Sequence, residues 1–153
     1  MLYRYYYIMK VVNSLVYRIS LMEFYQIEAL RRDGVTDNDI VMTLRSGDIT
    51  PWSKLNAHFD WRELLNLYEA DVDAFDPILA GDFQIKFITF PGLERILEMK
   101  FEQIADIDYT VGESAVTGLC LSEADEGLLR QMLSANWELI EHADGTLTVQ
   151  LRN

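Results

Sequence analysis

Sulfur and imidazole ligands are nearly absent from this sequence, which has one cysteine and two histidines among 153 residues. A single thiol cannot form an internal disulfide, and it cannot supply the thiolate set of a structural zinc site. The chain is nevertheless long enough to bury a core. We therefore expect it to fold unaided in a reducing compartment, without a metal or a cofactor.

Long apolar runs are also missing. No stretch of eighteen apolar residues occurs, and Arg4 and Lys10 interrupt the aromatic N-terminal stretch, which lacks the pattern of a signal peptide. The sequence therefore predicts a cytoplasmic protein with no membrane-spanning segment. Its length fits two small halves, residues 1–80 and 81–153, or one compact domain.

No residue pattern in the chain is typical of catalysis. His58 and His142 do not fall in a recognisable arrangement with a nucleophile. Cys120 lies in an apolar run without a nearby Lys or Arg, which predicts a buried core residue. The eight glycines are isolated from one another, so no phosphate-binding loop is present. We expect a non-enzymatic protein with no catalytic residues.

Two sets of aspartates lack the partners that a ligand site would need. Asp71, Asp73 and Asp76 begin like a calcium loop, but the sequence supplies no glycine at the sixth position and no late acidic ligand. Asp106 and Asp108 could form a carboxylate pair, yet a metal would need further ligands. The first set is expected in a solvated loop and the second on the exposed face of a strand.

Basic residues are scarce in the second part of the chain. The net charge is −12, and residues 51–153 hold seven Lys or Arg against nineteen Asp or Glu. The segment from Phe101 to Leu129 contains seven acids and no Lys or Arg. These acids are the candidate partner-binding residues: Glu102, Asp106, Asp108, Glu113, Glu123, Asp125 and Glu126. Such a surface repels nucleic acid and attracts basic proteins. The alternative is that the acidity only keeps the protein in solution.

Residues 1–80 are predicted to form a β-hairpin followed by helices. Residues 2–12 and 15–19 are β-prone and flank a possible turn. Capping patterns then predict two helices, which begin after Ser20 and Thr36 and end at Gly34 and Gly47. A third amphipathic helix is expected around residues 61–68, and residues 71–82 are expected to be a loop between the halves.

Residues 81–153 show the order β, α, β, β, α, β. Strands are expected at 83–87, 107–111, 115–121 and 137–142, and helices after Gly92 and Ser122. A last strand at 146–151 follows a turn at Asp144 and Gly145. This order predicts a ferredoxin-like α+β half with an extra C-terminal strand.

The segment Phe90-Pro91-Gly92-Leu93 resembles the start of the first helix in the ACT family, whose first strand runs into a Pro-Gly-Leu sequence. Residues 104–107 resemble the entry to that family's second strand, and the likeness covers about 60 residues. It implies a ferredoxin-like regulatory module that binds an amino acid. Phe90 departs from the family, which usually carries an acidic or amide residue at this position.

The helices on either side of Gly34 have the approximate spacing of a helix-turn-helix, although the second begins with Asp37 and Asp39, whose carboxylates would face phosphates. A plain helical hairpin is the alternative. We therefore expect an acidic interaction protein that regulates or inhibits a basic partner protein, as a nucleic-acid mimic or an immunity or anti-defence factor, without binding nucleic acid directly. The second hypothesis is a ligand-sensing transcription regulator.

Overall fold

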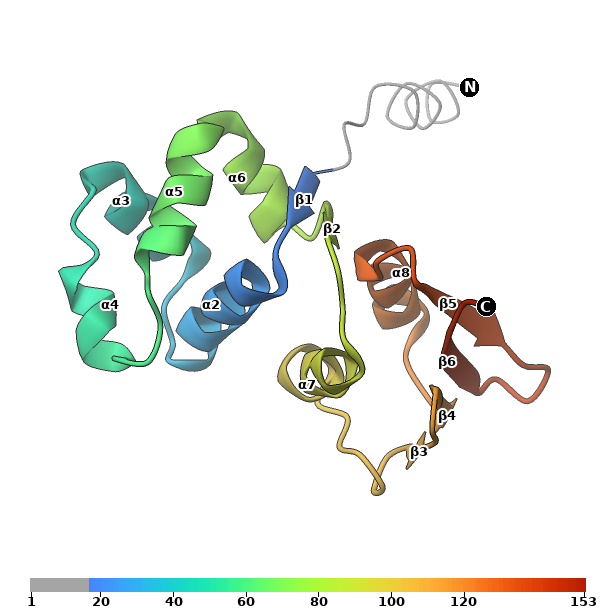
Figure 1. Cartoon of the computed structure of the whole chain (residues 1–153). Coiled ribbons are helices and arrows are strands. Elements are labelled where there is room, and N and C mark those ends of the chain that lie inside the picture. Colours follow the sequence, from blue (N-terminus) through green and yellow to red (C-terminus); the bar gives the residue numbers. More distant parts are fainter. Residues whose placement is uncertain (1–16) are drawn as a thin grey trace, which may run out of the picture.

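The computed structural model describes residues 17–153 and is a mixed α+β structure (Figure 1). The first strand and the turn of the hairpin expected over residues 2–19 lie outside the described residues. The first described elements are β1 (Tyr17–Ile19), α2 (Leu21–Arg32), α3 (Asp37–Ser46), α4 (Thr50–Leu55), α5 (Arg62–Ala70) and α6 (Val72–Leu79). They form the mainly helical part of the molecule.

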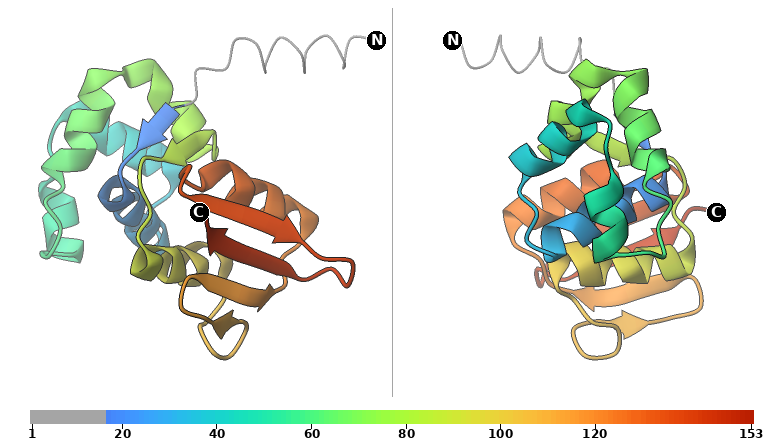
Figure 2. Two further views of the ribbon diagram at one scale, coloured as in Figure 1. Left: turned by 45° about the vertical axis from the view of Figure 1, so that its right-hand side comes forward. Right: turned by 90° about the vertical axis from the view of Figure 1, so that its left-hand side faces the viewer.

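The remaining elements are a strand that pairs with β1, two helices and a four-stranded antiparallel sheet. They are β2 (Phe83–Ile85), α7 (Phe90–Phe101), β3 (Thr110–Val111), β4 (Ala115–Leu119), α8 (Glu123–Met132), β5 (Trp137–Glu141) and β6 (Leu147–Leu151). The strand order is β3-β4-β6-β5, so β3 and β5 are the two edges. Figure 2 shows the β5–β6 hairpin in front of α8. The buried residues of both parts belong to one hydrophobic cluster.

The helix boundaries follow local capping chemistry, as the sequence predicts. The hydroxyl of Ser20 accepts a hydrogen bond from the backbone N–H of Glu23, and the Glu23 carboxylate accepts one from Ser20, which completes a capping box. Thr36 caps α3 in the same way, and Ser122 caps α8. Gly47 ends α3 with a φ of 76°, a left-handed conformation that favours glycine.

The loop expected over residues 71–82 is wrong, because α6 occupies most of it. Asp71 caps this helix by accepting a hydrogen bond from the N–H of Ala74, and Phe75 and Ile78 are buried against the core. Pro77 lies inside the helix, where burial of the apolar face outweighs the missing N–H. Pro51, expected in a linker, instead lies in the first turn of α4, where its fixed φ suits the helix.

The ferredoxin-like, ACT-like topology expected for residues 81–153 is not confirmed. A split βαβ fold would place β2 in the same sheet as the strands that follow it. In the structure β2 pairs in parallel with β1, with Ile85 opposite Ile19, and β6 lies between β4 and β5. Strand order depends on pairing between segments far apart in sequence, which the order of elements alone does not determine.

Cys120 is exposed, so its expected place in the core is wrong. The pairing of β4 with β6 shifts between Val116 and Leu119, and Gly118 within this bulge has a φ of 72°. An extra residue in a strand moves each following side chain to the opposite face. Val116 and Leu119 are therefore both buried, and Cys120 faces outward.

Ion pairs around the buried Glu28 connect α2, α3 and α7, and one hydrogen bond extends this network to α6. Glu28 is 7% exposed and lies within 2.9 Å of Arg31 and 3.0 Å of Lys100, a residue of α7. Arg31 also binds Asp37 at the start of α3 and donates to the carbonyl of Leu79 in α6. Burial alone would lower the pKa of Arg31, but the hydrogen bonds and charges of Asp37 and Glu28 outweigh it and raise the pKa.

Candidate functional site

The seven candidate carboxylates lie in three places. Glu102 ends α7 with a φ of 55°, and Asp106 and Asp108 follow it in the connection to β3. Glu113 lies in the turn between β3 and β4. The last three are in the first turn of α8: Glu123, Asp125 and Glu126. The structure therefore groups the acids around helix ends and turns, and it does not line them along one strand.

The acids of α8 already have local roles. Carboxylates in the first turn of a helix interact favourably with its dipole. Glu126 also forms an ion pair with Arg130 at 3.1 Å, one turn later. Glu123 and Glu126 line a hollow of about 620 Å³ together with Glu141 and Gly145 of the β5–β6 hairpin. Glu123 is exposed, whereas Asp125 and Glu126 are half-buried.

Asp106 and Asp108 occupy a tight turn, so the strand expected from residue 107 is wrong. Asp106 has a φ of 64°, which an extended strand cannot accommodate. Its N–H donates to the carbonyl of Tyr109 at 2.8 Å, and the N–H of Asp108 donates to the carbonyl of Ile104 at 2.8 Å. The Asp108 carboxylate closes the turn by accepting from the N–H of Ile104 at 2.7 Å. The strand begins only at Thr110.

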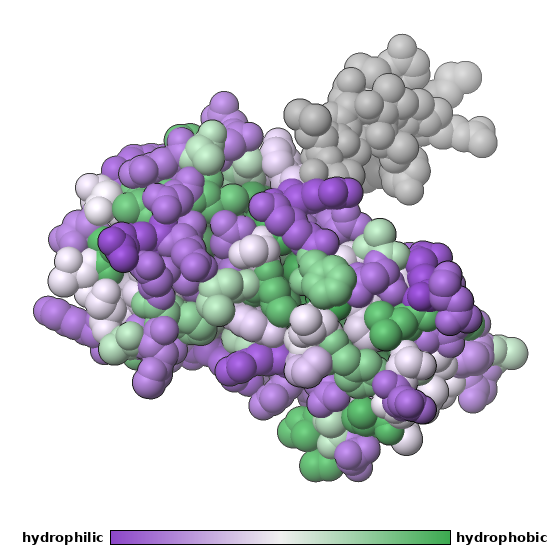
Figure 3. Space-filling model, in the orientation of Figure 1, coloured by the Kyte–Doolittle hydropathy of each residue, from purple (hydrophilic) through white to green (hydrophobic). Residues whose placement is uncertain are grey.

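This closed turn projects two isoleucines into solvent. Ile107 is 78% exposed and Ile104 is 48% exposed, and together we call them the apolar tip. Figure 3 shows hydrophobic surface at the lower end of the molecule, over the connection between α7 and β3. The sequence reasoning missed this feature, because alternation alone placed Ile107 on a strand. The available signal was its position between two aspartates, which favours a turn.

Tyr109 lies beneath the turn in a strongly negative environment. Its side chain is 4% exposed, and its hydroxyl has no hydrogen-bond partner among the described residues. Burial, together with the charges of Glu94, Asp106, Glu98 and Asp108, raises the pKa of Tyr109 to about 12. The carboxylates of α7 and those of the turn therefore both raise the pKa of this phenol.

Other polar residues singled out from the sequence have structural roles. His142 Nε2 lies 2.8 Å from the hydroxyl of Thr148 on β6, which pairs with Ile140. His58 is exposed, and its N–H donates to Asn56. Asp71 is the cap of α6, and Asp73 and Asp76 lie on that helix. Within residues 17–153 no three His, Cys, Asp or Glu residues are placed to hold a metal ion.

Two residues close to the features that suggested a regulator, Arg31 and Phe90, make contacts within the fold. Arg31, next to the possible helix-turn-helix, directs its guanidinium to Glu28, Asp37 and a carbonyl of α6. Phe90, at the ligand position of the ACT family, packs edge-on against Trp137 with ring centroids 5.6 Å apart. These contacts contribute to the fold, and the regulator hypothesis stays a prediction.

No helix within residues 17–153 has the length and apolar character needed to cross a membrane. Comparison with known proteins found no match, since no family model, no curated protein and no solved structure is similar to this chain.

Proposed function

We propose that this chain is a non-enzymatic protein that binds a basic partner protein through the turn at residues 104–109 and thereby regulates or inhibits it. One observation carries the proposal: the apolar tip is held outward on a closed turn and is flanked by the carboxylates of Asp106 and Asp108. An apolar centre with a charged rim is the usual arrangement of a protein–protein interface.

The turn is suited to binding because it is already ordered. Four backbone and side-chain hydrogen bonds join Ile104, Asp106, Ile107, Asp108 and Tyr109. A segment held in its bound shape loses less conformational entropy on association than a mobile one does. The exposed isoleucines can then fill an apolar pocket of the partner, and their burial favours the complex.

The carboxylates define the chemistry of the partner. Asp106, Asp108, Glu94 and Glu98 act together on Tyr109, so the surface around the tip has a negative potential. A partner that fits this surface has an apolar pocket with Lys or Arg at its rim, as in a protein that binds nucleic acid. Long-range attraction between such surfaces acts chiefly on association rate and specificity. Occupying that basic surface is how the chain would inhibit its partner.

Partner capture from a native lysate tests the proposal. The double variant Ile104→Ser, Ile107→Ser should lose a basic protein that the wild type retains, because its apolar tip is gone. Met42→Ser is the matched control, since Met42 is also an exposed apolar residue, 58% exposed, but lies on α3. Equal capture by wild type and double variant, or tight binding of the wild type to duplex DNA, would contradict the proposal.

A further inference from the structure

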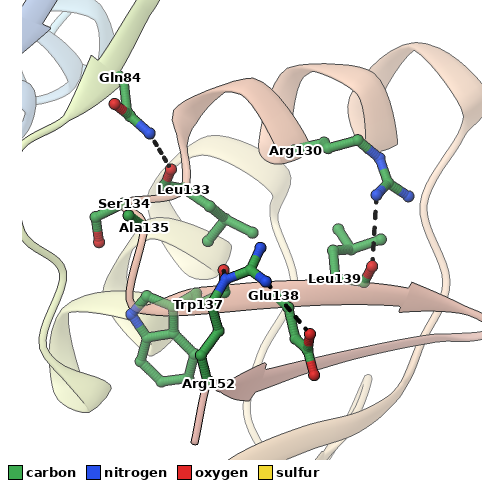
Figure 4. A pocket seen from close by; sticks show the side chains of 9 residues that line it. All are labelled: Gln84, Arg130, Leu133, Ser134, Ala135, Trp137, Glu138, Leu139 and Arg152. Atoms are coloured by element: carbon green, nitrogen blue, oxygen red, sulfur yellow. Dashed lines mark hydrogen bonds and ion pairs between the residues drawn. The ribbon is translucent and has the colours of Figure 1, made fainter.

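Hydrogen bonds within the chain hold several exposed side chains of this fold in place. In the groove beside β5, Arg152 pairs with Glu138 at 3.5 Å and donates to the carbonyl of Trp137 at 3.1 Å (Figure 4). Such a tether keeps a side chain from other atoms near it. The same kind of tether distinguishes two aspartates that the sequence makes alike.

Asp33 and Asp144 are the two aspartates that a glycine follows directly. In an Asp–Gly sequence the glycine nitrogen can attack the side-chain carboxyl carbon, because glycine has no side chain to hinder the approach. A C–N bond forms, and the hydroxyl of the neutral carboxyl leaves as water with the amide proton. Water then opens the succinimide ring at either carbonyl, which restores aspartate or gives isoaspartate, whose main chain is longer by one carbon. No oxidant, reductant or enzyme is required.

The backbones of the two Asp–Gly sites are alike. Gly34 has a φ of 82° and Gly145 a φ of 86°, and both values are left-handed. The N–H of Gly34 donates to the carbonyl of Arg31 at 3.0 Å, and that of Gly145 donates to the carbonyl of His142 at 3.0 Å. At each site the attacking nitrogen is held by the carbonyl three residues earlier, so the glycine does not distinguish the sites.

The two carboxylates differ. Asp144 Oδ1 accepts hydrogen bonds from the hydroxyl of Thr146 at 2.7 Å and from its N–H at 3.0 Å. These bonds lower the pKa of Asp144, so less of this carboxyl is in the neutral form that releases water. Asp33 is exposed and lines a hollow of about 260 Å³ between α2 and α7. In the part of the chain that the structure describes, its carboxylate takes part in no ion pair and accepts no hydrogen bond.

We infer that Asp33 is a site of spontaneous isomerisation to isoaspartate in the folded protein, and that the bonds from Thr146 protect Asp144 from the same reaction. A hydrogen bond to a charged group is strong enough to lower the population of the freed carboxylate about tenfold. Asp33 also directly follows α2, and helix ends fray. This inference does not depend on the proposed function of the apolar tip.

Isoaspartate at position 33 changes the junction between α2 and α3. Across this junction the N–H of Val35 donates to the carbonyl of Leu30 at 3.0 Å, and Arg31 binds Asp37 at 2.9 Å. An additional main-chain carbon cannot enter so short a connection without moving one of its ends. The modified chain should therefore lose the Arg31–Asp37 ion pair and part of its stability.

Incubation of the full chain in water labelled with heavy oxygen tests the inference, because each ring opening adds one labelled oxygen to the aspartate. Digestion in ordinary water and mass spectrometry then give the uptake at each site. In the folded protein, Asp33 should take up label about tenfold faster than Asp144. In the chain unfolded by guanidinium chloride, the two sites should react at similar rates, which would assign the difference to the fold.

Variants separate the two carboxylates further. Thr146→Val removes the hydroxyl donor and should raise the uptake at Asp144 several-fold without changing that at Asp33, whereas Thr146→Ser keeps the hydroxyl and is the matched control. Asp33→Glu should abolish uptake at that position, because its longer side chain would have to form a larger ring. Similar uptake at both sites in the folded wild type, or faster uptake at Asp144, would overturn the inference. So would an uptake at Asp144 that Thr146→Val leaves unchanged.

Discussion

Acidic side chains are used in opposite ways on α2 and on the turn after α7. Glu28 on α2 is buried and lies between two cations, at 2.9 and 3.0 Å. Asp106 and Asp108 are exposed, and in the described part of the chain neither pairs with a cation. The first carboxylate joins helices into one structure, whereas the other two leave their charge directed at solvent.

The difference follows from the cost of burying charge. A buried carboxylate is tolerated only when cations and hydrogen bonds replace its water, so Glu28 depends on Arg31 and Lys100. An exposed carboxylate keeps its water and needs no partner in the fold. Its charge therefore remains available to another molecule. Variants that remove one kind of carboxylate should accordingly affect stability, and variants that remove the other should affect binding.

The largest effect is expected for Glu28→Ala. The change leaves Arg31 and Lys100 without their shared anion, and both side chains are only 23% exposed. We expect a loss of about 3 kcal/mol in the free energy of unfolding, measured by urea denaturation. Glu69→Ala on α5 removes an exposed carboxylate and should stay within about 0.5 kcal/mol of wild type. Equal stability of the two variants would show that the buried network contributes little.

A smaller effect is expected for Asp108→Ala. Its carboxylate accepts the N–H of Ile104 at 2.7 Å, so alanine should cost about 1.5 kcal/mol and loosen the turn. Asp108→Asn keeps an oxygen acceptor and removes only the charge. Urea denaturation and amide exchange of Ile104 should therefore separate the two variants, with Asn close to wild type. If Ala and Asn behaved alike, the charge and not the hydrogen bond would hold the turn.

Local chemistry explains which parts of the fold were predictable. The caps at Ser20, Thr36 and Ser122 depend on residues three positions away, and all three were placed correctly from the sequence. The partner of β2 and the bulge at Gly118 depend on contacts with distant strands. Reading the sequence one segment at a time does not supply those contacts, so the sheet order and the exposure of Cys120 were missed.

The candidate site shows the same division. The acidic character of residues 102–126 could be read from the sequence, but its separation into a turn and a helix start could not. The apolar tip required the left-handed conformation of Asp106, which the order of residues alone does not predict. Charge is a property of composition, whereas convergence of side chains is a property of the fold.

Tyr109→Phe should increase stability by about 1 kcal/mol, because it removes a buried hydroxyl that has no partner among the described residues. The gain should grow above pH 10. The folded-state pKa of about 12 exceeds the ordinary value of 10.0, so the native state binds more protons across that window and loses stability as pH rises through it. Phenylalanine lacks this loss. Urea denaturation of both proteins at pH 8 and pH 11 measures the difference, and a constant gap would contradict the assigned pKa.

The smallest effect on stability is expected for the triple variant Asp106→Asn, Asp108→Asn, Glu113→Gln. All three residues are exposed, and asparagine tolerates the left-handed conformation found at Asp106. An asparagine in place of Asp108 also keeps an oxygen acceptor for the N–H of Ile104. We expect the free energy of unfolding to remain within about 0.5 kcal/mol of wild type.

Binding of this variant should nevertheless change. Its association rate with a captured basic partner should fall at low salt and approach that of wild type at high salt, because the lost charges act at long range. Stopped-flow mixing at two salt concentrations measures both rates. Glu63→Gln combined with Glu69→Gln removes two exposed carboxylates of α5 and serves as the control, which should leave the rate nearly unchanged. Equal rates for wild type and triple variant, with equal dissociation constants, would mean that these carboxylates only solvate the protein and that the difference between α2 and the turn has no bearing on recognition.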